Sequence, residues 1–240
     1  MNETVQLIPT SNLVLALIPV ALVITIMSYW SLNAKAAIYS IIRMLVQLLL
    51  VGYVLTTIFA ADHSWVVMLV MLVMVSAASW IALGSVKAHR AELYLIVFVS
   101  IAVGCGATLM LITQVVIDIS PWFEPRYMIP LAGMTFANAM NSVSLAAERL
   151  LSEVKRECDY SQARINAFQA AFIPTTNAML AVGLVSLPGM MTGQILSGVS
   201  PITAAHYQIV IMCMIFGSAG LSIICFLWLS RSRMIQSLAG

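Results

Sequence analysis

The longest part of this sequence without a charged side chain runs from Ile165 to Ser230, a stretch of 66 residues. A helix needs only about 20 apolar residues to cross the hydrocarbon core of a bilayer. The stretch is therefore too long for one crossing, and it is interrupted at Pro188-Gly189 and again at Pro201. Since proline and glycine end or bend helices, we expect two membrane-spanning helices separated by this interruption.

The rest of the chain is similarly apolar. Its 240 residues are 62% hydrophobic and 8% charged, whereas an average soluble domain has about 25% charged residues. A soluble domain could not bury so much apolar surface, but lipid can cover it. We expect an all-α polytopic membrane protein, a single transmembrane domain over residues 1–240, with about seven transmembrane helices at roughly 12–30, 36–60, 64–85, 93–117, 127–147, 167–187 and 203–229.

The Lys and Arg residues between these helices indicate the orientation, because short cytoplasmic connections are enriched in them. With the N-terminus outside, nine of these residues fall in inside connections and only Arg126 falls in an outside one. We therefore expect the N-terminus outside and the C-terminus in the cytoplasm. The nine are Lys35, Lys87, Arg90, Arg149, Lys155, Arg156, Arg164, Arg231 and Arg233.

Enzymatic activity is not indicated by any motif in this sequence. It has no HExxH, GxSxG or P-loop pattern, and its three histidines lack ligand spacing. Its net charge of +2 is too small to indicate nucleic-acid binding. No predicted helix has Asp or Glu in its middle, where proton- or sodium-driven carriers usually place acidic groups. We expect no cofactor in this chain, no nucleic-acid partner, and energy supplied by a partner at the cytoplasmic face.

Polar side chains gather on the predicted helix 127–147. Thr135, Asn138, Asn141 and Ser142 recur at spacings of three and four residues, so we expect them to share one face. Polar groups in lipid need hydrogen-bond partners, so this face should lie inside the bundle. Asn138 and Asn141 would then either bond to neighbouring helices or line a solute pathway.

The predicted helix 36–60 contains Arg43 and Gln47, one turn apart. Arg43 lies roughly 10 Å along the helix from its start, at 1.5 Å per residue. Its guanidinium either reaches back to the cytoplasmic headgroups or finds a polar partner inside the bundle.

The interruption between the last two predicted helices is uncharged and rich in glycine. Irregular backbone at membrane depth is tolerated only where it is buried in protein or lines a water-filled cavity. This segment is therefore part of a translocation path or gate, a re-entrant segment, or a plain interfacial turn. The candidate residues are Asn177, Pro188, Gly189, Met190, Met191 and Gln194.

Residues 148–166 form the longest charged segment, which the orientation places in the cytoplasm. Leu150 and Val154 lie on one apolar stripe if the preceding helix continues past the membrane. Arg149 and Glu153, four residues apart, would brace that helix. Lipid headgroups or the protein's own loops could cover the stripe.

Sulfur-containing residues allow two interpretations. The sixteen methionines either form a path for a soft metal or fill gaps between helices, the commoner use. None of the four cysteines forms a CxxC pair, and we interpret them as structural.

Several strings resemble the FetB-type iron-export permease family, from about residue 36 to the end of the last helix. The most specific is VGLVSLPGMMTG, residues 182–193. Others are Gly133-Met134, Asn138-Ala139-Met140, Ile173-Pro174-Thr175, Pro201, Tyr207-Gln208, Arg43, Gln47 and the string VGYVL at 51–55. Family members usually have a longer cytoplasmic segment with a Leu-Gly-Ala-type element, which residues 148–167 lack.

The resemblance implies a multi-pass permease of the inner (plasma) membrane. It implies a homodimer that pairs with a separate ATP-binding cassette ATPase subunit and exports a metal ion, with iron as the expected substrate. In that case Arg149, Leu150, Glu153 and Val154 would dock on the ATPase. The alternative is a membrane channel, carrier or scaffold that works without an ATPase.

Overall fold

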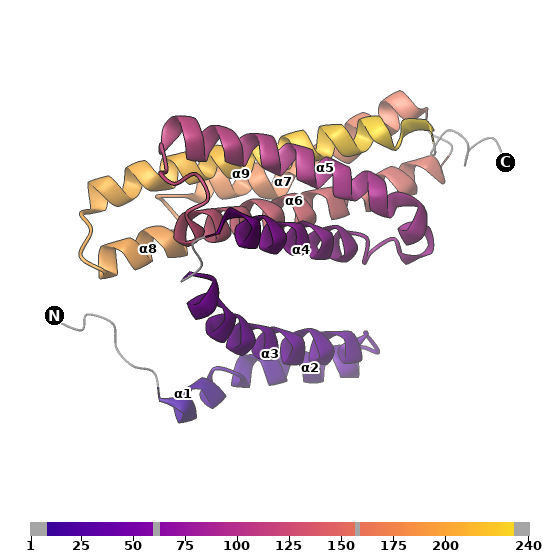
Figure 1. Ribbon diagram of the computed structural model, residues 1–240. Coiled ribbons are helices and arrows are strands. Elements are labelled where there is room, and N and C mark those ends of the chain that lie inside the picture. The colour runs from indigo at the N-terminus through magenta and orange to yellow at the C-terminus, as the bar shows by residue number, and fades with distance from the viewer. Residues whose placement is uncertain (1–8, 60–62, 157–158, 233–240) are drawn as a thin grey trace. The chain divides into compact units, whose positions relative to one another are not determined.

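The computed structural model describes residues 9–59, 63–156 and 159–232. The chain forms two compact units, Met1–Ala61 and Asp62–Gly240. Within the described residues every regular element is a helix, and one isolated bridge pairs Val182 with Ser186 (Figure 1). The predicted all-helical class is therefore confirmed.

In its described residues, 9–59, the first unit has three helices. They are α1 (Thr10–Leu15), α2 (Ile18–Tyr29) and α3 (Ala34–Ile58). The predicted helix 12–30 is thus divided in two, because Pro19 has no amide hydrogen to continue the α1 ladder. Asn33 begins α3, since its side-chain oxygen accepts a hydrogen bond from the Ala36 amide at 3.1 Å.

The second unit contains the remaining helices. They are α4 (Ser64–Ala82), the short 3-10 helix η1 (Lys87–His89), α5 (Arg90–Leu111), the π-helical turn η2 (Ile112–Val116), α6 (Pro125–Val154), α7 (Tyr160–Ala181), α8 (Gly189–Leu196) and α9 (Pro201–Leu229). The long helices run side by side along a common direction, and the shorter α8 lies against α9 (Figure 1).

Helix α6 is at the centre of this unit, because it packs against α4, α5, α7 and α9. More than half of its 30 residues are buried. Since protein rather than lipid covers most of α6, its side chains need not be uniformly apolar. This explains why α6 can hold polar residues that make it less hydrophobic than its neighbours α4, α5 and α9.

Five predicted spans coincide with helices that are long and apolar enough to cross a membrane. In the described part of the chain these are Ser11–Tyr29, Ala34–Ile58, Ser64–Ala82, Lys87–Val116 and Pro201–Leu229. The predicted spans 127–147 and 167–187 fall on α6 and α7, which are long enough but more polar. A count of seven spans rests on these two and stays a prediction.

The helix ends around the predicted cytoplasmic segment differ from the predicted membrane spans. Helix α6 continues to Val154 rather than ending at 147, and α7 begins at Tyr160 and ends at Ala181 rather than covering 167–187. The predicted coupling segment 148–166 is therefore not a separate element. It consists of the end of α6, a short connection and the start of α7, which packs back along α6.

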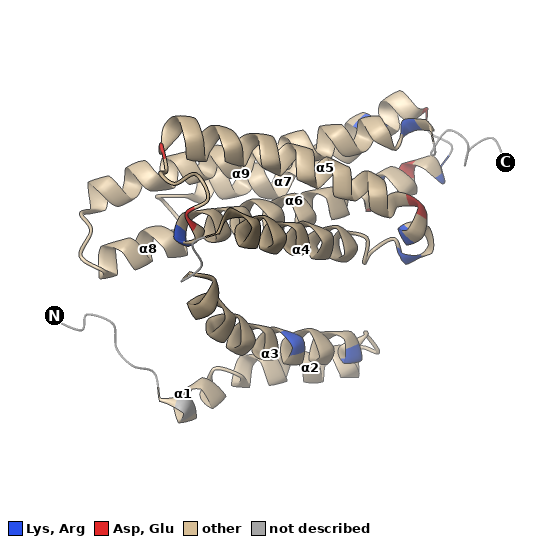
Figure 2. Ribbon diagram, in the orientation of Figure 1, with Lys and Arg blue, Asp and Glu red and all other residues tan. Residues whose placement is uncertain are grey.

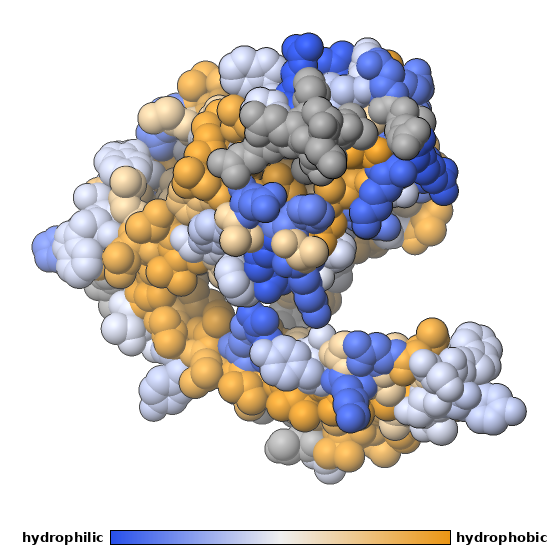
Figure 3. Space-filling view, turned by 90° about the vertical axis from the view of Figure 1, so that its right-hand side faces the viewer, coloured by the Kyte–Doolittle hydropathy of each residue, from blue (hydrophilic) through white to orange (hydrophobic). Residues whose placement is uncertain are grey.

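Charged side chains gather at the two ends of the second unit (Figure 2). One end combines the C-terminal ends of α4, α6 and α9 with the N-terminal ends of α5 and α7. Two contacts demonstrate this: the Ser85 and Ser144 hydroxyls lie 3.3 Å apart, and the Tyr160 hydroxyl donates to the Leu227 carbonyl. Figure 3 looks onto this end, where hydrophilic residues gather beside an apolar flank. Arg126 lies at the start of α6, at the opposite end.

Candidate translocation site

The backbone turns sharply where α7 ends. Val182 is extended, and Gly183 has a positive φ of 83°, which glycine adopts without steric cost. The amides of Leu184, Val185 and Ser186 all donate to the carbonyl of Ala181, at 3.2, 2.8 and 3.1 Å. This turn satisfies its own backbone and leaves the Leu184 and Val185 side chains exposed.

Pro188 then begins α8 with extended backbone angles, and Gly189 is the first helical residue. The Thr192 hydroxyl donates to the Pro188 carbonyl at 3.1 Å, which stabilises this first turn. Gly189 has ordinary helical backbone angles. The left-handed positions are Gly183 and Gly198, with φ of 83° and 90°, one on each side of α8.

A cavity of about 350 Å³ lies between the end of α7, the start of α8 and the first turns of α9. Its lining includes four sulfur-containing side chains from three helices and one amide. These are Met179 on α7, Met191 on α8, and Gln208, Met212 and Cys213 on α9. Val182, Gly183, Leu187, Ala205 and Ile209 complete it. We call it the sulfur-lined cavity.

Gln208 is the buried polar group of this cavity. Its side chain is only 6% exposed, and its Oε1 atom has no hydrogen-bond partner among the described residues. A buried acceptor without a partner loses its hydration without compensation, which is why nearly all such groups in folded proteins are bonded. An acceptor in this position is available to a ligand in the cavity.

The structure brings some of the predicted path residues to this site. Met191 lines the cavity directly, and Met190 and Gln194 lie on the same helix α8. The Gln194 Oε1 atom is also buried without a partner. Asn177 is an exposed side chain on α7 and does not line the cavity.

The polar residues of α6 do not share a single face. Thr135 and Ser142 are buried, whereas Asn141 is exposed. Asn138 is half-buried and donates to the Met134 carbonyl of its own helix at 2.8 Å. The expected inward position therefore holds for Thr135 and Ser142 and fails for Asn141. Residues spaced by three and four cover a band of helix surface that is wide enough to include exposed positions.

Arg43 and Gln47 lie one turn apart on α3, as the sequence predicts. Both belong to the first unit. Whether the Arg43 guanidinium reaches the headgroups or a polar partner inside the bundle stays open, and both alternatives remain predictions.

The prediction that Leu150 and Val154 contact an ATPase has to be corrected, because both side chains are buried. Leu150 is fully buried and Val154 nearly so, because the end of α6 packs against α7 and α9. Arg149 and Glu153 do form the expected ion pair, 2.6 Å apart, but Glu153 is only 3% exposed. The apolar stripe thus exists, and the protein's own helices cover it.

Of the sulfur-containing and amide side chains that line the sulfur-lined cavity, four were not predicted as site residues from the sequence: Met179, Gln208, Met212 and Cys213. A signal was present, because Gln208 and Met212 are four residues apart and share a face of α9 with Ala205. Met179 belongs to another helix, and only the folded arrangement joins it to them. No three His, Cys, Asp or Glu side chains among the described residues lie close enough together to hold a metal ion.

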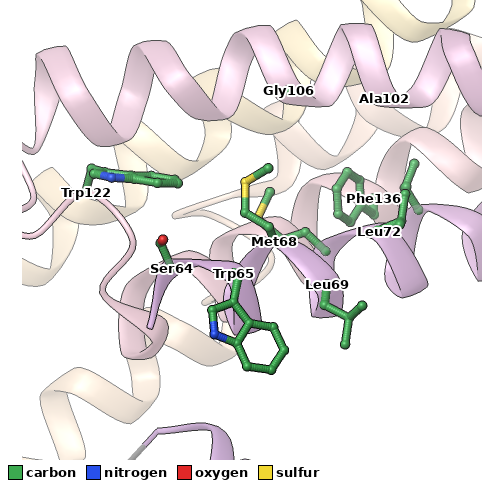
Figure 4. Close-up of a pocket in the computed structure, with 11 residues that line it drawn as sticks. Ser64, Trp65, Met68, Leu69, Leu72, Ala102, Gly106, Trp122 and Phe136 are labelled. Carbon is green, nitrogen blue, oxygen red and sulfur yellow. The ribbon is translucent and has the colours of Figure 1, made fainter. Parts of the chain in front are cut away.

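A second, larger cavity of about 790 Å³ lies between α4, α5 and α6 (Figure 4). In Figure 4 Met68 lies between Trp122 at one end and Phe136 at the other. Apart from Ser64 its lining is apolar or aromatic, and it includes Met71. It contains methionines without a buried amide, in contrast to the sulfur-lined cavity.

Comparison with known proteins gives one matching family, described as "Uncharacterised protein family (UPF0014)", over residues 10–166 and 159–235. The chain is 34% identical to the "Probable iron export permease protein FetB" of Escherichia coli, over 94% of this chain and 91% of that protein. It is 38% identical to the "UPF0014 membrane protein slr1647" of Synechocystis, over 76% of each. It is 35% identical to the Arabidopsis thaliana "Protein ALUMINUM SENSITIVE 3", over 86% and 81%. No solved structure matches this chain.

Proposed function

We propose that this chain, which belongs to the UPF0014 family, is the membrane subunit of an exporter that moves iron or another metal ion out of the cytoplasm. The observation that carries the proposal is its 34% identity, over nearly its whole length, to a probable iron export permease. The apolar helices agree with this, since five described helices can cross a membrane.

Energy for uphill transport would come from ATP hydrolysed on a separate subunit. Among the described residues Glu153 is the only buried charged side chain, and its partner is Arg149 at the charged end of the unit. Proton- or sodium-driven carriers usually have acidic groups near the bilayer middle, and the described helices have none there. This supports coupling to an ATP-binding cassette ATPase.

The ATPase would bind at the end of the unit where most Lys and Arg residues gather, which the positive-inside rule assigns to the cytoplasm. Leu150 and Val154 are buried, so they cannot contact it. An exposed alternative exists beside them: Lys87, Ala88, Glu148, Ser152 and Lys155 surround a depression of about 330 Å³. We call these five residues the cytoplasmic polar surface.

Two chains would assemble in the inner (plasma) membrane as a homodimer. The support is the exposed apolar side chains of the second unit, among them Trp65, Leu69 and Leu95, which lipid or a second copy can cover.

Cells that lack the gene should accumulate iron under iron load, and re-expression of the chain should restore export. A tagged chain should also retain a P-loop ATPase on purification. A chain that inserts stably, leaves cellular iron unchanged and retains no ATPase would contradict the proposal. That outcome would favour an ATPase-independent channel, carrier or scaffold.

A further inference from the structure

We propose that the sulfur-lined cavity binds a soft monovalent metal cation, Cu(I) being the physiological candidate. The ligands would be the thioethers of Met179, Met191 and Met212, with Gln208 Oε1 and the Cys213 thiol beside them. The inference rests on the proposed metal-export function and assigns a cation class to one site in the chain.

The donor atoms decide the class of metal. Thioethers and thiols are soft ligands that select Cu(I), whereas hard cations such as Mg²⁺ and Ca²⁺ prefer carboxylates, carbonyls and water. No Asp or Glu occurs between Ile165 and Ser230, the stretch that contains every residue of the cavity. The free-energy cost of removing a cation from water grows with its charge. Neutral ligands can therefore compensate this cost more readily for a monovalent cation than for a divalent one.

Gln208 supplies an observation independent of the sulfur content. Its Oε1 atom is buried at the cavity and has no partner among the described residues. A hydrophobic packing site would gain by excluding such an atom, since an unpaired buried acceptor destabilises the fold. A cation in the cavity would give this oxygen the interaction that it lacks.

The arrangement also differs from ordinary filling of gaps by methionine. The three methionines lie on α7, α8 and α9, so they line the cavity from different helices rather than along one helix face. The cavity between α4, α5 and α6 provides the contrast, because its Met68 and Met71 both lie on α4 and it has no buried amide. Those two residues are therefore the matched control.

The test measures Cu(I) binding to the purified full chain, without oxygen and with ascorbate present, in competition with the chelator bicinchoninate. Cys158 and Cys225 are replaced by Ser in all samples, whereas Cys105 is kept because its side chain is fully buried. The triple variant Met179→Leu, Met191→Leu, Met212→Leu should lose one equivalent of bound Cu(I), or bind it at least about tenfold more weakly. Gln208→Leu should also weaken binding, and Met68→Leu, Met71→Leu should leave it unchanged.

Equal binding by the parent and the triple variant would overturn the inference. So would equal losses in the triple variant and in the Met68, Met71 control. Met and Leu exchange with little change in volume, so the variants should still fold, and size-exclusion profiles verify this. If Cu(I) binding is unaffected by the triple variant while the chain still restores iron export, only the cation assignment fails. If no metal export occurs at all, the proposed function fails instead.

Discussion

Gly104 of α5 lies directly against Ser222 of α9. A Cβ atom added at Gly104 would be 2.3 Å from Ser222 Oγ, 2.6 Å from its amide nitrogen and 2.9 Å from its Cα. The two helix backbones therefore touch at this point, as small residues allow between membrane helices.

Gly104→Ala should separate α5 from α9 and destabilise the protein by about 1–3 kcal/mol, the usual effect of overpacking. Thermal unfolding in detergent measures this. Ser222→Gly should not rescue the variant, because the backbone atoms of residue 222 remain in contact. Gly106→Ala is the control: nothing lies within 4 Å of its added Cβ, so it should be neutral or slightly stabilising. Equal stability of the two alanine variants would contradict the close approach.

Gly183→Ala and Gly198→Ala should each destabilise the protein, by about 1–2 kcal/mol, because a Cβ atom disfavours left-handed angles. Gly189→Ala should not, since Gly189 is an ordinary helical residue with open space around it. Comparing the melting temperatures of the three variants tests this. If Gly189→Ala is the most damaging of them, the backbone of this turn differs from the one described.

Arg149→Ala should destabilise the protein by about 3–5 kcal/mol, because it leaves the buried Glu153 carboxylate unpaired. The double variant Arg149→Met, Glu153→Leu should recover most of that loss, since it removes both charges and keeps the volume. A denaturation series on the single and double variants measures the difference. A double variant no more stable than Arg149→Ala would show that the pair is not the source of the effect.

The positions of apolar residues in the sequence predict which of them share a helix face, but they do not predict which other helices pack against that face. Periodicity predicts the stripe of Leu150 and Val154, and α6 does continue through it. That α7 and α9 cover the stripe depends on α7 packing back along α6, which no local pattern contains. The same limit applies to the candidate site. Pro188 marks the interruption, whereas Met179 and Gln208 meet only through contacts between helices.

The positions of left-handed residues are also not predictable from composition. Gly183, Gly189 and Gly198 are equivalent as helix breakers in the sequence. Only two of them have positive φ, because the turns on either side of α8 require it there. The aromatic and methionine content of the large cavity in Figure 4 likewise gives no sequence signal, since its lining comes from α4, α5, α6 and the connection that holds Trp122.

The cytoplasmic polar surface predicts where an ATPase partner binds. Lys87→Glu with Lys155→Glu reverses two exposed charges without disturbing buried residues. The chain should still fold, but the reversed charges should weaken the complex by about 1–2 kcal/mol, roughly tenfold. Co-purification at increasing salt concentrations measures how much ATPase each chain retains. The parent should retain more ATPase than the charge-reversed variant, and the difference should be largest at low salt, where charges are screened least.

Two comparisons make this test specific. Arg126→Glu reverses a charge at the opposite end of the unit, so it should leave ATPase retention unchanged. Leu150→Asp with Val154→Asp places two carboxylates in a fully packed interior, so that variant should fail to fold rather than selectively lose its partner. If Arg126→Glu releases the ATPase and the lysine pair does not, the partner binds the other end. The orientation with the C-terminus in the cytoplasm would then be wrong as well.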